Sequence, residues 1–172
     1  MSNINVRKLQ LVDAKGIATV HVLSWQNTYR GLMADEILDS LDIEDRTKKW
    51  KEIILADQPN WEGIVAVLDD EVVGWTTYGK SRDENAAENT GELWAIYVHP
   101  KFLGKGAGSL MMKEALESLK KMGFRKATLW VLTTNSKSRK WYESKGWHLS
   151  GKTKIEKRAE NELHETQYQI NL

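Results

Sequence analysis

The chain has 172 residues, of which 41% are hydrophobic and 28% are charged, and its formal net charge is +1. This length and composition favour one domain with a substantial core over residues 1–172, and the near-neutral charge argues against nucleic acid as a partner. The longest apolar runs fall far short of the ~18–20 residues that cross a bilayer, and no signal-peptide region is visible. We therefore expect a cytoplasmic protein with no membrane partner.

The sequence contains no cysteine, which excludes disulfides, thiolate metal sites and a cysteine nucleophile. The four histidines are scattered without metal-ligand spacing, so we expect no bound metal. No Gly-x-Ser-x-Gly motif indicates a serine hydrolase. Any group that the protein transfers must then use another route.

The first half of the chain predicts a strand, two helical regions and an antiparallel pair of strands, in the order 6–9, 13–25, 34–54, 62–68 and 72–78. Asp13 is a residue type that caps helix N-termini, and a break is expected near Asp42. The acidic connection at 69–71 predicts a hairpin between the two strands.

The second half predicts alternating strands and helices, with strands at 92–98, 127–132, 147–155 and 163–170 and helices at 105–121 and 136–145. Helices interspersed among strands imply an α/β domain built around a mixed sheet. The helix over 105–121 carries an apolar face that must pack on this sheet.

A glycine-rich turn joins the strand at 92–98 to the following helix. Gly104, Gly106 and Gly108 leave the backbone open to close approach, and free amides at the start of a helix favour an anion. Lys105 adds a positive charge. A P-loop is excluded because Gly106, and no Ser or Thr, follows this lysine. The pattern therefore predicts a phosphate site of another kind.

A second motif follows about thirty residues later, at 135–147. A strand, a polar turn and a helix place Ser138 and Tyr142 on one helical stripe that looks back toward the strand end. Together with Tyr97-Val98-x-Pro100 and the three glycines, this segment strongly resembles the GCN5-related N-acetyltransferase (GNAT) superfamily. The resemblance covers most of the chain and is sharpest from Glu92 to Trp147.

The resemblance implies an α/β (α+β) fold with a mixed, mostly antiparallel central sheet flanked by helices. Its fourth and fifth strands splay apart, and acetyl-CoA enters the gap as a cosubstrate. The strand residues implied to meet the pantetheine arm and the acetyl carbonyl are Ile96, Tyr97 and Val98. The residues implied to cradle the pyrophosphate are Leu103, Gly104, Lys105, Gly106, Ala107, Gly108 and Ser109.

The resemblance also implies that Asn135 and Tyr142 face the arm and the sulfur. Tyr142 is then the general acid, because a phenol within hydrogen-bond reach can protonate or stabilise a leaving thiolate. Asn135 is equally suited to cap the helix that follows it, and the two roles are compatible. Many relatives carry Arg or Gln in place of Leu103, so we expect weaker affinity for CoA here.

The acceptor amine must lose a proton before it attacks, and Glu92 is the best candidate for the base, directly or through a water chain. With regular alternation Glu92 shares a face with Ile96 and Val98, whereas the bulge usual in this family reverses that phase. The alternative is a solvated carboxylate at the end of a strand.

Trp25, Tyr29 and Arg30 lie where relatives build the acceptor pocket, and their aromatic faces suit a cationic or apolar group. Ordinary packing between helices is the alternative.

The sequence therefore predicts an acetyl-CoA-dependent N-acetyltransferase that acts on a primary amine of a small molecule, such as a polyamine, an amino acid derivative or an aminoglycoside-like compound. The alternatives are acetylation of a protein N-terminus or lysine, and a catalytically weak acyl-CoA-binding module. The identity of the amine and the oligomeric state, a homodimer included, stay open.

Overall fold

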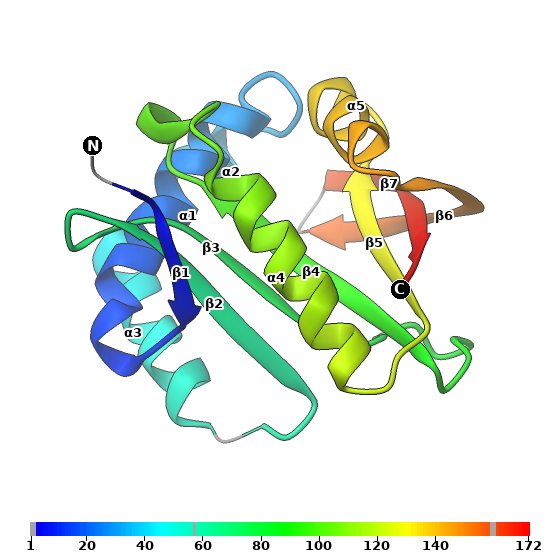
Figure 1. The fold of residues 1–172 in the computed structure, drawn as a ribbon. Helices are drawn as coiled ribbons and strands as arrows, with labels where there is room; N and C mark the ends of the chain where they lie inside the picture. Colours follow the sequence, from blue (N-terminus) through cyan, green and yellow to red (C-terminus); the bar gives the residue numbers. More distant parts are fainter. Residues whose placement is uncertain (1–2, 57, 159–160) are drawn as a thin grey trace.

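The computed structural model describes residues 3–56, 58–158 and 161–172. These residues fold into a mixed β-sheet with helices on both faces (Figure 1). Its strand order is β1-β2-β3-β4-β5-β7-β6, and each neighbouring pair is antiparallel except β4–β5. The strands are β1 (Asn5–Lys8), β2 (Trp61–Leu68), β3 (Glu71–Lys80), β4 (Thr90–Val98), β5 (Lys126–Leu132), β6 (His148–Arg158) and β7 (Asn161–Asn171). The mixed, mostly antiparallel sheet expected from the sequence is confirmed.

The described residues also form five α-helices: α1 (Ala14–Tyr29), α2 (Asp35–Asp39), α3 (Ile43–Leu55), α4 (Ala107–Lys121) and α5 (Ser136–Ser144). Single 3-10 turns stand at Leu11–Asp13 and Pro100–Phe102. The predicted break near Asp42 is confirmed, because the side chain of Asp42 accepts a hydrogen bond from the backbone N–H of Asp45 and caps α3. Within the described ranges, no helix is long and apolar enough to cross a membrane.

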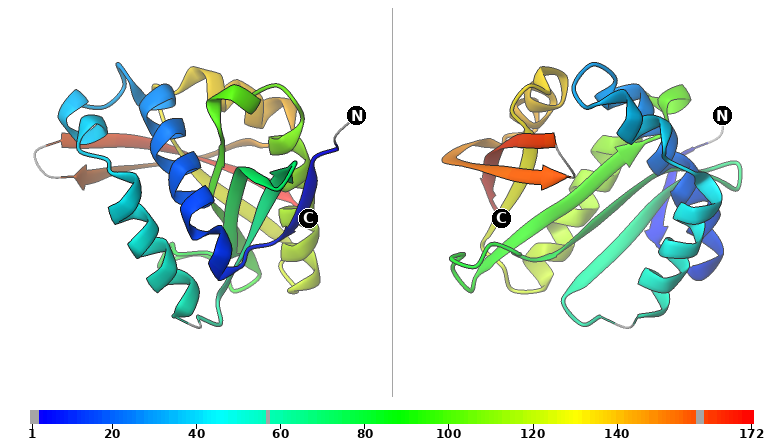
Figure 2. Two further views of the ribbon diagram at one scale, coloured as in Figure 1. Left: turned by 90° about the vertical axis from the view of Figure 1, so that its left-hand side faces the viewer. Right: turned by 180° about the vertical axis from the view of Figure 1, so that it is seen from behind.

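Helix α4 covers one face of the sheet, and α1 and α3 cover the other (Figure 2). The α4 side buries Leu93, Met111, Leu119, Leu129 and Tyr168 in one cluster. The α1 side buries Ile17, Val20, Trp50, Val65 and Trp75 in another. Because the first cluster draws on both β4 and β5, α4 holds the two halves of the sheet together.

Asp13 stands directly before α1, as predicted, but its side chain does not cap the helix. The carboxylate is 5% exposed and accepts hydrogen bonds from the guanidinium of Arg7 at 2.7 and 2.8 Å. It also accepts one from the backbone N–H of Gln10 at 2.8 Å. Asp13 is therefore the N-cap residue of α1, as predicted, but its side chain makes no capping hydrogen bond because these donors occupy both carboxylate oxygens.

The predicted hairpin joins β2 and β3 through a two-residue turn. Asp69 and Asp70 have positive φ angles of 49° and 65°. This is the pattern of a type I′ turn, whose twist matches that of the strands it joins.

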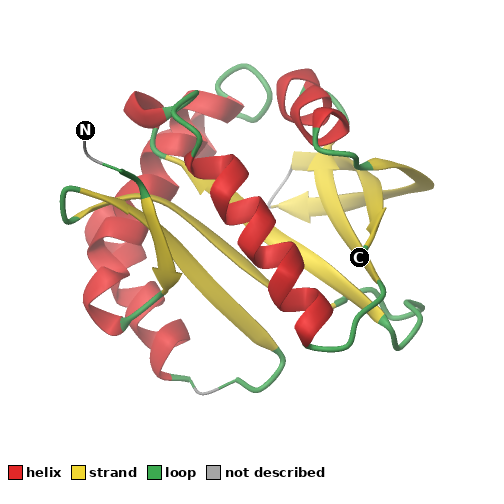
Figure 3. Ribbon diagram, viewed as in Figure 1, coloured by secondary structure: helices red, strands yellow, loops and turns green. Residues whose placement is uncertain are grey.

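Strands β4 and β5 pair only over their first residues, at Thr90↔Lys126, Gly91↔Ala127 and Glu92↔Thr128. Beyond this point β4 stays paired with β3, and β5 stays paired with β7. Figure 3 shows the two strands diverging. The facing edges of β4 and β5 thus have no strand partner along the rest of their length, as far as the described residues extend. The predicted splay is confirmed.

Candidate active site

The glycine loop lies at the wide end of the gap between β4 and β5, where α4 begins (Figure 1). Gly104 and Gly106 have φ angles of 76° and 92°, which glycine adopts without strain. A Cβ added to either would meet nothing within 4 Å, so the space before their backbone is open. Helix α4 starts at Ala107, and the first amides of a helix have no partner within it. The loop therefore offers an open anion site lined by backbone donors.

The other residues of this loop contribute packing more than charge. A Cβ on Gly108 would lie 3.2 Å from the ring of Trp141, so the approach of α5 to α4 leaves little room there. Leu103 is 45% exposed, and the ammonium of Lys105 lies 4.9 Å from the ring centroid of Phe102. Ala107 is buried and Ser109 is half-buried. The open backbone is thus the main hydrogen-bonding feature that the loop presents.

A β-bulge in β4 decides which side chains face which helices. The register with β3 shifts by one residue and leaves Trp94 as the extra residue. Leu93 and Ile96 pack on the α4 side, whereas Tyr97 packs on the α1 side. Because side chains alternate along a strand, Glu92 faces away from Leu93 and shares the face of Tyr97. The regular alternation that groups Glu92 with Ile96 does not hold.

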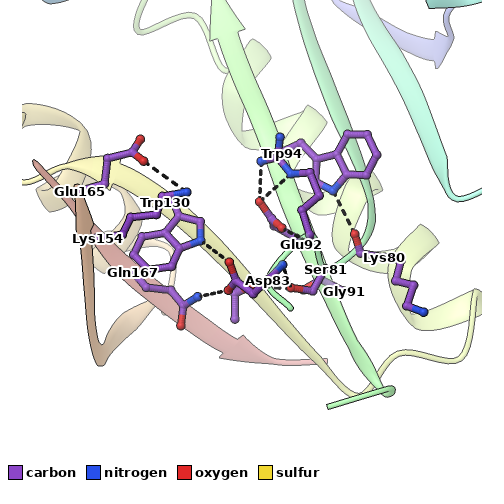
Figure 4. Close-up of polar contacts among 12 residues, drawn as sticks. Lys80, Ser81, Asp83, Gly91, Glu92, Trp94, Trp130, Lys154, Glu165 and Gln167 are labelled. Atoms are coloured by element: carbon purple, nitrogen blue, oxygen red, sulfur yellow. Dashed lines mark hydrogen bonds and ion pairs between the residues drawn. The ribbon is translucent and has the colours of Figure 1, made fainter. Parts of the chain in front are cut away.

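Glu92 is 1% exposed, so the alternative of a solvated carboxylate at the strand end is wrong. Its Oε2 accepts a hydrogen bond from the backbone N–H of Arg82 at 2.8 Å. Its Oε1 accepts from Nε of Arg82 at 3.1 Å and also from Nη2. Figure 4 shows this carboxylate at the base of the gap, near Trp94 and Ser81. The carboxylate is therefore buried and paired with Arg82.

Helix α5 brings Asn135 and Tyr142 to the other side of the gap. Asn135 is 4% exposed, and its Oδ1 accepts a hydrogen bond from the backbone N–H of Ser138 at 3.2 Å. The predicted N-cap is confirmed. The amide nitrogen of the same side chain has no acceptor among the described residues, so it remains available to a ligand.

Tyr142 packs into the α4-side core, where its ring centroid lies 6.3 Å from that of Trp147 and 6.4 Å from that of Tyr168. Burial raises the pKa of Tyr142 well above its usual value, and the nearby phenol of Tyr97 raises it further. The phenol therefore keeps its proton at neutral pH. Its hydroxyl has no hydrogen-bond partner in the described part of the chain, whereas the other four tyrosines each have one. Tyr142 is thus an uncommitted donor.

Aromatic residues of α1 gather on the face of β4 that carries Tyr97. The hydroxyls of Tyr29 and Tyr97 hydrogen-bond at 3.1 Å. The ring of Trp25 lies 5.2 Å from that of Tyr29 and 6.3 Å from that of Tyr97, centroid to centroid. Arg30 points elsewhere, with ion pairs of 2.9 Å to two aspartates of α2. The structure therefore brings Trp25 and Tyr29 to the site, but not the guanidinium of Arg30.

Two further residues near this site carry no local motif in the sequence. Glu165 of β7 forms an ion pair of 3.3 Å with Lys154, and burial raises the pKa of Glu165. Its charge helps to raise the pKa of Tyr29, which places it near the tyrosines. The guanidinium of Arg158 lies 5.3 Å from the ring centroid of Trp25, so the end of β6 reaches α1. The sequence predicts only that Glu165 lies within a strand, at 163–170.

No group of three or more histidine, cysteine, aspartate or glutamate residues within the described ranges is arranged to hold a metal ion.

Comparison with known proteins agrees with this geometry. The model of the acetyltransferase (GNAT) family matches residues 22–147. The uncharacterized N-acetyltransferase YuaI of Bacillus subtilis (strain 168) is 33% identical over 134 residues, which cover 77% of this chain and 73% of that protein. The chain therefore belongs to the GNAT acetyltransferase family and is an acyltransferase of the N-acetyltransferase class.

Other relatives extend the likeness over nearly the whole chain. The spermidine N(1)-acetyltransferase of Thermoplasma acidophilum is 27% identical over 150 residues, which cover 86% of this chain and 89% of that protein. The crystal structure of the PaiA N-acetyltransferase from Thermoplasma acidophilum in complex with coenzyme A superimposes with a TM-score of 0.75. It covers 99% of both chains at 22% identity, and so shares the fold.

Proposed function

We propose that this chain, as one domain over residues 1–172, transfers an acetyl group from acetyl-CoA directly to a primary amine of a small molecule. The observation that carries the proposal is the uncommitted hydroxyl of Tyr142 beside the gap between β4 and β5. The open glycine loop at the wide end of the same gap supports it.

The residues present fit coenzyme A. The amides that open α4, from Gly106 to Ser109, would hold the pyrophosphate, because they lack partners and point toward open space. The unpaired edge of β4 over 96–98 would hydrogen-bond the pantetheine arm as a strand partner does. The amide nitrogen of Asn135 would meet the same arm from α5. Bound acetyl-CoA would supply the acetyl group as a thioester.

Two side chains of this chain handle the protons. The attacking nitrogen forms a bond to the acetyl carbon, the carbon–sulfur bond breaks, and the sulfur leaves as a thiolate. Tyr142 donates a hydrogen bond to that sulfur; since a thiol has a pKa near ~8.5, full transfer from a phenol of raised pKa is uphill. Glu92 receives the proton of the amine through water, since it lies four positions before Ile96 on the strand, a separation of roughly 13 Å.

The contacts on the α1 side favour a small acceptor. Arg158 lies over the ring of Trp25, so the end of β6 touches α1 and restricts access to the face that carries Tyr97. Glu165 places a carboxylate on that face, where it pairs with Lys154 at 3.3 Å, and an acceptor ammonium would compete with this lysine for it. The spermidine acetyltransferase among the relatives supports an amine of this kind.

A screen of amines tests the proposal. The full-length protein would be mixed with acetyl-CoA and a panel of polyamines, amino acids, aminoglycosides and peptides with a free N-terminus or lysine, and released thiol would be measured. We expect thiol release with at least one small amine. Release with peptides alone would shift the acceptor to proteins. Binding of CoA without release would support a binding module, and no binding in calorimetry would overturn the proposal.

A further inference from the structure

The carboxylate of Glu92 is held by a residue of the irregular segment between β3 and β4. Arg82 binds both carboxylate oxygens, one through its guanidinium and one through its own backbone N–H. The side chain of Glu92 is 1% exposed, while that of Arg82 is 54% exposed. The guanidinium thus covers the carboxylate on its solvent side and also lies 5.0 Å from the ring centroid of Trp94.

The next residue fixes this segment to the far side of the gap. Asp83 accepts a hydrogen bond from the indole N–H of Trp130 on β5 at 3.0 Å. It accepts another from the side-chain amide of Gln167 on β7 at 2.7 Å. Figure 4 shows Asp83 between these two side chains, beside Glu92. Neighbouring residues therefore connect the base of β4 to β5 and β7, and they hold Arg82 in place.

The other charged groups on this face are already engaged. Lys154 of β6 and Glu165 of β7 pair with each other at 3.3 Å, and the ammonium of Lys154 lies 4.4 Å from the ring centroid of Trp130. Asp83 is held by Trp130 and Gln167. Within the described residues, Arg82 is the one charged group in contact with Glu92.

We infer that Arg82 is a positioning residue that keeps the Glu92 carboxylate ionised and oriented, and thereby sets the lowest pH at which the enzyme works. The inference rests on the proposed function, in which Glu92 receives the proton of the amine. A buried carboxylate favours its neutral form unless an opposite charge and hydrogen bonds stabilise the ionised form. Arg82 supplies both. Without it, Glu92 would be protonated at higher pH and could not accept a proton.

The experiment compares the wild type with Arg82→Gln and Arg82→Lys in two measurements. The first is the pH dependence of kcat/KM for the best amine of the panel. The second follows the side-chain carboxyl carbon of Glu92 by NMR during a pH titration, assigned with Glu92→Gln, and needs no acceptor. In Arg82→Gln we expect the carboxyl to titrate at least one pH unit higher than in the wild type, and the acidic limb of kcat/KM to move by the same amount. Arg82→Lys keeps the positive charge, so both its Glu92 titration and its acidic limb of kcat/KM should lie between those of the wild type and Arg82→Gln.

The chain offers a matched control in Arg7, which also binds a buried carboxylate, that of Asp13, through two guanidinium nitrogens beside a backbone N–H donor. Arg7→Gln should lower stability without moving the pH profile. Equal Glu92 titrations in wild type and Arg82→Gln would overturn the inference. If Arg82→Gln does not fold, the same two measurements on Arg82→Lys and Asp83→Asn test the inference. The first substitution weakens the contacts of Arg82 with Glu92, and the second weakens the contacts that hold the segment of Arg82 in place. Wild-type turnover in Glu92→Gln at every pH would instead refute the proposed base.

Discussion

The hydroxyl of Tyr29 is hydrogen-bonded to that of Tyr97 at 3.1 Å, and this contact ties the last residue of α1 to β4 beyond the point where β4 leaves β5. Burial raises the pKa of both phenols, so the pair stays neutral at physiological pH. Tyr142 reaches the same gap from the α4 side. One wall of the gap therefore holds phenols that bond each other, and the other holds a phenol free to bond a ligand.

Tyr142→Phe should lower kcat by about 100-fold with little change in CoA binding, because it removes one hydroxyl that no described residue uses. Steady-state kinetics and calorimetry with CoA would check this. Tyr78→Phe is the control, since that hydroxyl donates to Glu62 away from the gap. Equal turnover in Tyr142→Phe and the wild type would refute the role of this phenol.

Gly106→Ala should raise the KM for acetyl-CoA at least tenfold and cost about 1–2 kcal/mol of stability. The stability cost follows from placing a Cβ on a residue with φ of 92°. The loss of affinity follows because the Cβ enters the open space before the amides. Gly123→Ala is a matched control at the other end of α4, with φ of 95° and equally open space. It should lose similar stability and keep the KM; if both variants change KM alike, the loop is not the anion site.

Asn135→Asp should keep the stability of α5 and weaken acetyl-CoA binding severalfold. Aspartate caps a helix as well as asparagine does, but it loses the amide donor and adds a negative charge near an anionic ligand. Asn135→Ala loses both functions and should also cost about 1 kcal/mol of stability. Thermal melts and KM measurements separate the two effects. An unchanged KM for acetyl-CoA in Asn135→Asp would show that Asn135 only caps α5 and does not bind the cosubstrate.

His21→Phe should make stability less dependent on pH between 7.5 and 5. Burial, with the charges of Arg46 and Arg158, lowers the pKa of His21 to about 3. In the unfolded chain His21 takes up a proton with a pKa near ~6.5. The stability that the protein has above this pH is therefore lost progressively as the pH falls toward the pKa of His21 in the folded state. At pH 5 this loss is on the order of 1–2 kcal/mol. Urea unfolding of the wild type and of His21→Phe at pH 7.5 and pH 5 measures how much stability each protein loses. Equal losses in the two proteins would show that His21 also takes up its proton in the folded protein.

Local sequence signals account for most of the elements but not for the contacts between them. The cap at Asn135 follows from residue type and from its place between a polar turn and a predicted helix. The splay of β4 from β5 followed only from the family resemblance, because no composition or periodicity encodes where two strands part. The N-cap position of Asp13 was predicted, but the partner of its side chain was not, since Arg7 lies on another element.

The face of Glu92 depended on a bulge that the sequence does not mark. An extra residue at Trp94 reverses the alternation, and pairing with β3 over the whole strand places it. Arg82 was missed because it stands ten residues away in an irregular segment, where no spacing rule applies. Glu165 was missed because its place beside the tyrosines depends on the register of β7 against β5 and β6.

The parting of β4 from β5 leaves a sheet that the polypeptide alone does not complete. An elongated molecule with its own amide groups, inserted between the two edges, would act as the missing strand, so its binding would stabilise the folded state. The melting temperature should then rise with the concentration of coenzyme A, by an amount equivalent to ~2.7 kcal/mol at one hundred times the dissociation constant.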